Sequence, residues 1–270
     1  MNPIGPAWLF CPADRPDRYL KALERADRVI LDLEDAVAAD RKDFARTALL
    51  EYPVDPDRVI VRVNSTRSSG GQADLEALQQ TRYRTIMVPK AESAAELDVL
   101  DGFDVVALCE TSAGVLAAPE IARHPSVVAL MWGAEDLVAD MGGRGSRGPD
   151  GGYYGVALHT RSRILLAASA AGVVAVDAVY LNIADLGGLR AEAREAVDSG
   201  FAVKACIHPG QVPVVRETFL PTPEQVSWAR AIIAADTGGV VSLDGVMVDG
   251  PVVLQARHVL ARHENTTSDS

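Results

Sequence analysis

Short apolar runs alternate with longer segments of mixed polarity along most of the chain. Between the runs, apolar residues recur with helical spacing, as in residues 16–26, 74–80, 93–100 and 161–172. This alternation predicts repeated strand–helix–strand units and therefore a parallel sheet. The runs themselves predict eight strands, at residues 7–11, 28–33, 58–63, 85–89, 105–110, 127–132, 178–183 and 201–207.

Eight strand–helix units over residues 1–220 favour an α/β fold, a (β/α)8 TIM barrel that forms the catalytic domain. A doubly wound open sheet is the competing architecture. Such a sheet usually has fewer strands, and the first strand–helix turn here lacks the G-x-G-x-x-G sequence of dinucleotide-binding sheets. The barrel is therefore the preferred prediction.

The pattern changes after the eighth run. Residues 221–235 have helical spacing, and residues 238–250 predict a hairpin around the turn dipeptide Asp244-Gly245. A further helix follows, and then a polar tail of the kind that frays. We therefore expect residues 221–270 to form a C-terminal extension of helix, hairpin and helix that acts as a lid or in oligomerisation.

Composition narrows the range of functions. Of the 270 residues 48% are hydrophobic, and the net charge of −11 argues against non-specific nucleic-acid binding. No apolar stretch approaches the roughly 20 residues of a membrane span, and the first ten residues do not resemble a signal peptide. The three cysteines lie far apart, so neither a disulfide framework nor a zinc motif is indicated. We expect a cytoplasmic protein that binds neither nucleic acid nor membrane.

Polar side chains gather where the predicted strands end. Three carboxylates, Asp32, Glu34 and Asp35, end the second strand or follow it directly, and Arg62 lies at the end of the third. The carboxyl ends of the strands carry the chemistry in barrels of this kind. The later strands end in, or run into, Lys90, Glu110, Glu135, Asp136, Lys204 and His208.

Side chains alternate between the two faces of a strand, which sharpens this grouping. Asp32 and Glu34 share a face with Ile30, and Arg62 shares one with Ile60. Glu110 follows the same rule on the fifth strand. One consistent orientation therefore brings Glu34, Arg62 and Glu110 together in the mouth of the barrel.

Clustered carboxylates need a compensating cation. Arg62 and Lys90 supply part of the charge, and a divalent metal would supply more. Because the candidate ligands are carboxylate oxygens without a histidine or cysteine partner, the site suits Mg²⁺, with Mn²⁺ as the alternative ion, and disfavours zinc. Salt bridges across the top of the barrel are the competing explanation for each acid.

The sequence resembles the citrate lyase beta-subunit-like proteins and the malyl-CoA and citramalyl-CoA lyases of the HpcH/HpaI aldolase group. The resemblance spans the barrel and reaches VMVDGPVVLQAR in the tail. It implies a homotrimer or a multiple of one. The matching stretches include LFCPADRPDRYLKAL, ADRVILDLEDAVAADRK, VRVNS, IMVPKAES, CETSAGVLAAPEIA, WGAEDLVADMG and KACIHPGQV, in the order of the family.

The resemblance also implies roles for individual residues. Glu110 and Asp136 would bind Mg²⁺, and Arg62 would bind the carboxylate or carbonyl of a small oxo-acid. Glu34 and Asp35 would hold metal-bound waters. The remaining assignments are Phe10, Arg15 and Lys21 as contacts of coenzyme A, and Asp249 as an acid/base that closes over the site of a neighbouring subunit.

The activity implied is that of a carbon–carbon lyase, which cleaves or forms a 3-hydroxyacyl-CoA thioester from an acyl-CoA and an oxo-acid such as oxaloacetate, pyruvate or glyoxylate. Three alternatives to this activity stay open. The chain could be the citryl lyase subunit of a larger complex that uses an acyl carrier, a CoA thioesterase with the same site, or an inactive scaffold.

The role of Asp249 also has alternatives, since it could equally be a solvated loop acid or the N-cap of the last helix.

Three further features have competing readings. Residues 142–155 are rich in glycine but lack the G-K-[ST] ending of a P-loop, so we expect a mobile substrate loop. Basic residues gather in and around the first helix, with Arg18, Lys21 and Arg25 on one face of it and Arg15 and Arg28 nearby. They form either a solvated face or an anion-binding patch. His208 is expected to cap backbone rather than to act in catalysis.

Overall fold

The computed structural model describes residues 5–236, 238–243 and 246–267. Its internal contacts divide the chain into two compact units, a barrel unit up to Val215 and a C-terminal unit from Arg216 onward. Within the described ranges, every helix is too short or too polar to cross a bilayer.

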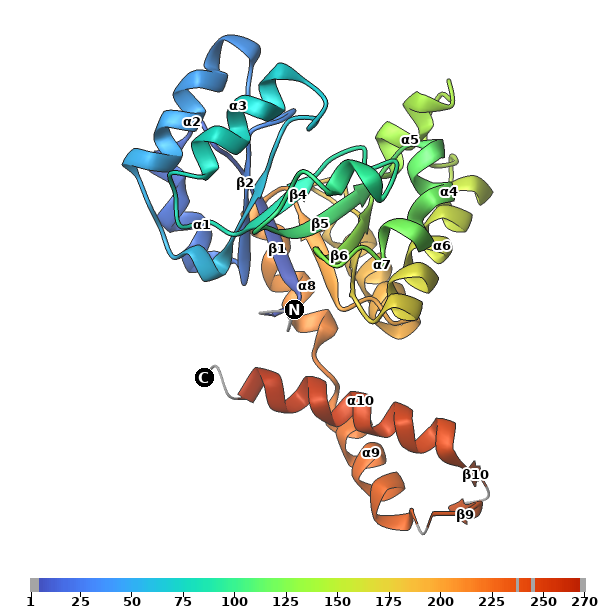
Figure 1. Ribbon diagram of the computed structural model, residues 1–270. Coiled ribbons are helices and arrows are strands. Elements are labelled where there is room, and N and C mark those ends of the chain that lie inside the picture. The colour runs from blue at the N-terminus through green and yellow to red at the C-terminus, as the bar shows by residue number, and fades with distance from the viewer. Residues whose placement is uncertain (1–4, 237, 244–245, 268–270) are drawn as a thin grey trace. The chain divides into compact units, whose positions relative to one another are not determined.

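The barrel unit contains a closed sheet of eight parallel strands in chain order, in which β1 also pairs with β8 (Figure 1). The predicted (β/α)8 barrel is therefore confirmed. The strands are β1 (Ala7–Pro12), β2 (Arg28–Asp32), β3 (Val59–Arg62), β4 (Thr85–Val88), β5 (Asp104–Cys109), β6 (Val127–Trp132), β7 (Val174–Asp177) and β8 (Val203–Cys206).

Helices connect most of the strands and surround them (Figure 1). The segment 93–100 departs from its predicted helix, because only the 3-10 turn Ala95–Leu97 forms there. The helices are α1 (Tyr19–Arg25), α2 (Lys42–Glu51), α3 (Ser69–Leu78), α4 (Ser112–Ile121), α5 (Ala134–Asp140), α6 (Gly155–Ala171), α7 (Leu186–Ser199) and α8 (Val212–Phe219).

The seventh strand lies earlier in the chain than its predicted position at 178–183. Residues 173–183 form a nearly continuous apolar stretch, interrupted by Asp177 and Asn182. Asp177 is fully buried at the end of β7 rather than at a break before the strand. The apolar side chains of Leu181 and Ile183 are instead exposed, in the loop that follows.

The barrel interior is filled by alternate residues of its strands. They include Ile30 and Ile60, the residues whose faces Asp32 and Arg62 share. Because side chains of equal parity point to the same side of a sheet, the polar residues at the carboxyl ends of these strands lie above this apolar floor. The floor comprises Trp8, Ile30, Ile60, Met87, Val106, Leu108, Ala129, Met131, Val174, Val176, Val203 and Ala205.

The C-terminal unit contains α9 (Pro223–Ala235), an antiparallel hairpin and α10 (Gly250–Thr267). The predicted hairpin is present, with β9 (Val241–Leu243) paired to β10 (Val246–Val248), while its turn at 244–245 lies outside the described residues. The last helix extends through part of the predicted polar tail. The two helices pack against each other around Ala229, Ile232, Val248, Val253 and Ala256.

Candidate active site at the barrel mouth

Asp32 organises the mouth of the barrel from the end of β2. Its carboxylate is fully buried and accepts four hydrogen bonds. Two come from the backbone N–H groups of Glu34 (2.8 Å) and Ala36 (3.0 Å), which shape the loop after the strand. The other two come from Nε and Nη2 of Arg62, at 2.8 and 2.6 Å. Asp32 is therefore committed to fixing the loop and the guanidinium.

Arg62 is directly opposite Asp32 in the β2–β3 register. Its third nitrogen, Nη1, lies 3.0 Å from Oε2 of Glu34, and its guanidinium carbon lies 4.9 Å from the centre of the Phe10 ring. Burial lowers the pKa of Arg62, but the hydrogen bonds and charge of Asp32 more than offset this and raise it above the ordinary value. Arg62 is thus a permanent cation with a fixed orientation.

Lys90 follows β4 with a φ of 51°, a left-handed conformation that is uncommon for a residue with a side chain. Its ammonium lies 3.0 Å from Glu34 Oε1, 3.2 Å from Asp136 Oδ1 and 3.7 Å from Glu110 Oε1. Its backbone N–H donates a 3.2 Å hydrogen bond to the same Glu110 oxygen. This one residue therefore contacts three carboxylates.

Glu110 and Asp136 face this ammonium from different elements. Glu110 follows β5 and is buried, whereas Asp136 lies in the first turn of α5 with 39% of its side chain exposed. Burial, and then the charge of Asp136, raise the pKa of Glu110 to about 8. Gly133 leaves room for Glu110, since a Cβ atom there would lie 2.5 Å from Glu110 Oε2.

These six residues, Asp32, Glu34, Arg62, Lys90, Glu110 and Asp136, form what we call the mouth cluster. It contains four carboxylates and two cations, so its formal charge is −2 when all six are ionised. Burial is the largest cause that raises the pKa values of Glu110 and Glu34, and the charges of Arg62 and Lys90 lower them without offsetting it. The residues present fit a hard divalent cation held by carboxylate oxygens.

The described residues contain no group of three His, Cys, Asp or Glu side chains arranged to hold a metal. A cation at Glu110 and Asp136 would therefore have two protein ligands and complete its shell with water or substrate. Mg²⁺ is commonly bound in this way, because it gives up its waters reluctantly.

The structure places the other predicted site residues around this centre or apart from it. Asp35 is exposed beside Glu34, and Phe10 lies under Arg62. Arg15, before α1, is paired with Asp17 at 3.1 Å, and Lys21 is exposed on α1. The predicted basic patch does not include Arg28, which is buried at the opposite, amino-terminal end of β2.

Asp249 belongs to the C-terminal unit, just before α10. Its Oδ1 accepts a 3.3 Å hydrogen bond from the backbone N–H of Val252, so the chain uses it as an N-cap. The assignment of Asp249 as an acid/base across a subunit boundary stays a prediction. His208 caps backbone as expected, since its Nδ1 accepts from the N–H of Gly210.

A second charged group lies between the outer side of β7–β8 and helices α6 and α7. The Asp177 carboxylate accepts from Arg161 (2.9 and 3.0 Å), Lys204 (2.9 Å) and Trp132 Nε1 (2.9 Å). The Lys204 ammonium uses its other hydrogens on Glu192 and on the carbonyl of Ala178. We call this group, with Arg147 and Glu195, the α6–α7 cluster.

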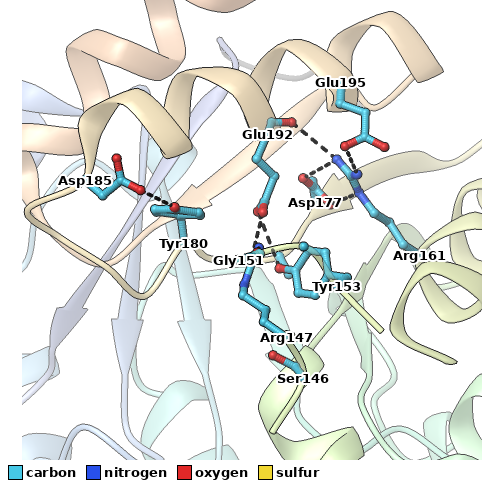
Figure 2. Close-up of polar contacts among 12 residues, drawn as sticks. Ser146, Arg147, Gly151, Tyr153, Arg161, Asp177, Tyr180, Asp185, Glu192 and Glu195 are labelled. Carbon is cyan, nitrogen blue, oxygen red and sulfur yellow. Dashed lines mark hydrogen bonds and ion pairs between the residues drawn. The ribbon is translucent and has the colours of Figure 1, made fainter. Parts of the chain in front are cut away.

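The α6–α7 cluster also anchors the glycine-rich loop. Figure 2 shows Glu192 reaching from α7 toward Arg147 and Tyr153, which belong to this loop. Arg147 binds Glu192 at 2.6 Å and lies 3.6 Å from the centre of the Tyr153 ring. The predicted role of residues 142–155 in binding substrate stays a prediction.

The comparison with known proteins decides the family. Residues 7–209 match the family described as HpcH/HpaI aldolase/citrate lyase. The chain belongs to this family. A citrate lyase subunit beta-like protein of Mycobacterium tuberculosis is 52% identical over 100% of this chain and 99% of its own length. A (3S)-malyl-CoA thioesterase of Cereibacter sphaeroides is 36% identical, over 92% of each chain.

Solved structures of the HpcH/HpaI aldolase/citrate lyase family agree with the fold. The protein CitE of M. tuberculosis, in complex with magnesium, acetoacetate and coenzyme A, matches with a TM-score of 0.94 at 51% identity, over 98% of this chain and 100% of its own. A citrate lyase beta subunit of the same organism, complexed with oxaloacetate and magnesium, gives 0.80 at 55% identity, over 81% and 98%.

Sequence reasoning missed one contact and one residue at the mouth of this barrel. Asp32 was recognised as one of three acids, but its pairing with Arg62 was not, although aligning the ends of the second and third strands would have revealed it. Lys42 of α2 donates to the carbonyls of Leu33 and Glu34, both at 2.6 Å, and so holds the Glu34 loop from behind. No motif in the sequence signals this contact.

Proposed function

We propose that the chain is a Mg²⁺-dependent carbon–carbon lyase, which cleaves or forms a 3-hydroxyacyl-CoA thioester from an acyl-CoA and a small oxo-acid. The observation that carries this proposal is the mouth cluster, where Glu110 and Asp136 share the ammonium of Lys90 and lie beside an arginine fixed by Asp32. Its members lie at or just after the carboxyl ends of five strands, β2 to β6, the arrangement expected of a barrel active site.

In this proposal Glu110 and Asp136 bind the metal, and Glu34 and Asp35 hold its waters. Bound there, Mg²⁺ would act as a Lewis acid toward the oxygens of the oxo-acid portion. Mn²⁺ is the alternative ion, because its preference for oxygen ligands is similar. The magnesium in the M. tuberculosis relatives supports this assignment.

Arg62 binds the carboxylate or carbonyl of the oxo-acid. A guanidinium has five N–H donors, and three of those of Arg62 face Asp32 and Glu34. The contacts with Asp32 and Glu34 fix the orientation of the remaining donors, which lowers the free-energy cost of ordering them in the reaction. Oxaloacetate, pyruvate and glyoxylate are the candidate oxo-acids, and the oxaloacetate in one relative favours this class.

The thioester portion is bound near Phe10, Arg15 and Lys21. Arg15 and Lys21 lie on the segment that leaves the carboxyl end of β1, and in this proposal both bind anionic groups of coenzyme A. When the carbon–carbon bond breaks, the hydroxyl loses its proton, its oxygen becomes the carbonyl of the oxo-acid, and the acyl fragment departs as an enolate. Asp249 of a neighbouring subunit in a homotrimer acts as the base that takes this hydroxyl proton and then, as the acid, returns it to the enolate carbon.

A direct assay tests the lyase. The purified chain with Mg²⁺ is incubated with malyl-, citramalyl-, citryl- and 3-hydroxy-3-methylglutaryl-CoA, and the released oxo-acid is measured. We expect Glu110→Gln and Asp136→Asn to abolish both turnover and calorimetric binding of Mg²⁺ with oxaloacetate. Glu135→Gln is the matched control, since Glu135 lies beside Asp136 but is bonded to Ser146. Undiminished binding in both acid variants would refute the metal assignment.

Two alternatives lead to different products in the same assay. The malyl-CoA thioesterase relative favours a hydrolytic activity as the second candidate, and free thiol release without loss of the hydroxy-acid would identify it. The other alternative is a citryl lyase subunit of a larger complex. Such a subunit would be inactive on all four CoA esters and would act only on an acyl-carrier thioester.

Mixing two inactive variants tests the position of Asp249. Asp249→Ala and Glu110→Ala chains are combined, and a tagged pull-down establishes that their subunits exchange. If Asp249 acts on a neighbouring barrel, some mixed oligomers contain one intact Glu110 site and one intact Asp249, and partial activity returns. Exchange without activity would leave Asp249 as the N-cap that it is in its own unit.

A further inference from the structure

Lys90 contacts the two carboxylates that are proposed as ligands of the metal. Its ammonium is in contact with both Asp136 and Glu110, and with Glu34 as well. The ammonium lies against Glu110 Oε1 and Asp136 Oδ1, so a cation bound by these two acids would lie beside it and the two positive charges would repel strongly. Binding of Mg²⁺ therefore favours movement of the ammonium away from the acids.

Lys90 is built so that its side chain can leave while its backbone stays. The side chain is 35% exposed and ends a flexible stem, which gives it a route to solvent. The backbone N–H is held on Glu110 by the left-handed turn, independently of the ammonium. Arg62 differs, because its side chain is 12% exposed and both oxygens of Asp32 hold it.

We propose that Lys90 is a displaceable internal counter-ion of the mouth cluster. Its ammonium neutralises Glu110 and Asp136 before the metal binds, competes with Mg²⁺ for them, and moves toward solvent when Mg²⁺ takes its place. This inference rests on the proposed function insofar as these two acids are the metal ligands. It makes Lys90 a residue that tunes metal affinity rather than one that supplies chemistry.

The competition sets the direction of two measurable effects. Without the ammonium, the acids repel one another in the metal-free protein, so the metal-free fold is less stable. Mg²⁺ no longer has to displace a resident cation, so it binds more tightly. A lysine that assisted metal binding, or one that was only a surface cation, would not give this pair of effects when it is removed.

The experiment compares Lys90→Met with Arg67→Met, using Mg²⁺ alone as the probe. Arg67 is the matched control because it pairs with Glu92 (2.9 Å) and Glu96 (3.9 Å) and with no acid of the mouth cluster. Calorimetry at pH 9 gives the affinity, and thermal unfolding with and without Mg²⁺ gives the stability. Two further variants are measured. Lys90→Arg is a control that retains a positive charge, and Lys90→Gly removes the charge with a residue that readily adopts the left-handed backbone.

We expect Lys90→Met to bind Mg²⁺ about tenfold more tightly than the unmodified chain, the size of a lost repulsion near the protein surface. Its Tm without metal falls by about 3 °C, and Mg²⁺ raises its Tm by more than it raises that of the unmodified chain. Arg67→Met and Lys90→Arg keep the original affinity. If Lys90→Met does not fold, Lys90→Gly is measured in its place with the same expectation.

The outcomes separate this inference from the proposed function. If the unmodified chain binds Mg²⁺ and Lys90→Met binds it equally or more weakly, the counter-ion role is wrong while the metal site stands. If the unmodified chain binds no Mg²⁺ under these conditions, the metal assignment itself fails, and the counter-ion role fails with it.

Discussion

The mouth cluster and the α6–α7 cluster both bury ionisable side chains, yet they treat charge in opposite ways. In the α6–α7 cluster, three carboxylates meet three cations, and the ammonium of Lys204 has a partner for each of its hydrogens. In the mouth cluster, four carboxylates meet two cations. One group is neutral without any ligand, and the other is not.

Two carboxyl groups make the contrast measurable. Asp177 is fully buried, and burial alone would raise its pKa, but Lys204 and Arg161 hold it below the ordinary value. Glu110 is almost as buried, and its pKa rises to about 8 because burial and Asp136 outweigh Lys90 and Arg62. Burial alone therefore does not distinguish these two acids, whereas the balance of charge around each of them does, and it makes Glu110 the candidate for a functional role.

The largest expected effect comes from breaking the neutral cluster. Lys204→Met leaves Asp177 and Glu192 with one cation fewer in a buried setting, so the free energy of unfolding should fall by about 3–5 kcal/mol. Urea unfolding measures it. Glu195→Gln is the control, because Glu195 is 61% exposed and its ion pair should contribute less than about 1 kcal/mol. A loss below that value in Lys204→Met would show that the cluster does not stabilise the fold.

The next effect concerns catalysis rather than folding. Arg62→Lys keeps a positive charge but cannot hold both oxygens of Asp32 while also contacting Glu34. We expect kcat/KM to fall by an amount equivalent to about 2–4 kcal/mol of transition-state stabilisation, with the fold intact. Steady-state kinetics measure this loss. A near-normal kcat/KM would exclude a direct role for Arg62.

The two clusters should change the stability of the fold in opposite directions as the pH rises. Because the folded-state pKa of Glu110 is raised to about 8, its protonated form favours folding, and stability should fall as pH rises toward 8, by at most about 1.4 kcal/mol per pH unit. The lowered pKa of Asp177 acts oppositely: its contribution is present above the unfolded pKa and is lost in acid.

Urea unfolding in EDTA between pH 6 and pH 8 measures the Glu110 contribution as the difference between the unmodified chain and Glu110→Gln. The glutamine variant should lack this fall in stability. Saturating Mg²⁺ should flatten it in the unmodified chain, because a bound cation keeps the carboxylate ionised. Parallel pH curves for the two proteins would contradict the raised pKa.

The smallest expected effect comes from one added methyl group. Gly133 has a φ of −125° and a ψ of 124°, which alanine adopts without strain, but its Cβ would displace the Glu110 carboxylate. Gly133→Ala should weaken Mg²⁺ binding about tenfold, or about 1.4 kcal/mol, with little change in Tm. Gly145→Ala, where nothing lies within 4 Å, is the control. Equal affinities in the two variants would show that Glu110 tolerates the shift.

Sequence reasoning gave the barrel and the composition of its mouth because both depend on local patterns. Alternation along each strand was enough to bring Glu34, Arg62 and Glu110 to one end. The seventh strand was misplaced because Asp177 resembles a strand break until its partners on α6 and β8 are known. The segment 93–100 has good helix formers, but the side chain of Glu96 accepts from the N–H groups of Glu92 and Ser93 and caps a tighter turn instead.

The sequence did not predict which acids and cations face one another in the two clusters. The roles of Lys204 and Lys90 look alike in the chain, since both are lysines in or just after a strand. They differ because Lys204 points outward between helices to matched acids, while the left-handed backbone of Lys90 turns its ammonium over the mouth. Orientation of this kind arises from tertiary contacts that no spacing rule encodes.

The pairing of β1 with β8 determines when the protein can complete its sheet during synthesis. Ala7, Trp8 and Leu9 find their partners only when Lys204, Ala205 and Cys206 have left the ribosome. At about 5–20 residues per second, the hydrogen-bonding edge of β1 stays open for roughly 10–40 s. The strand AWLFCP is apolar throughout, so the nascent chain exposes an aggregation-prone edge over this interval, and chaperone binding to the N-terminal strand should end when β8 closes the ring.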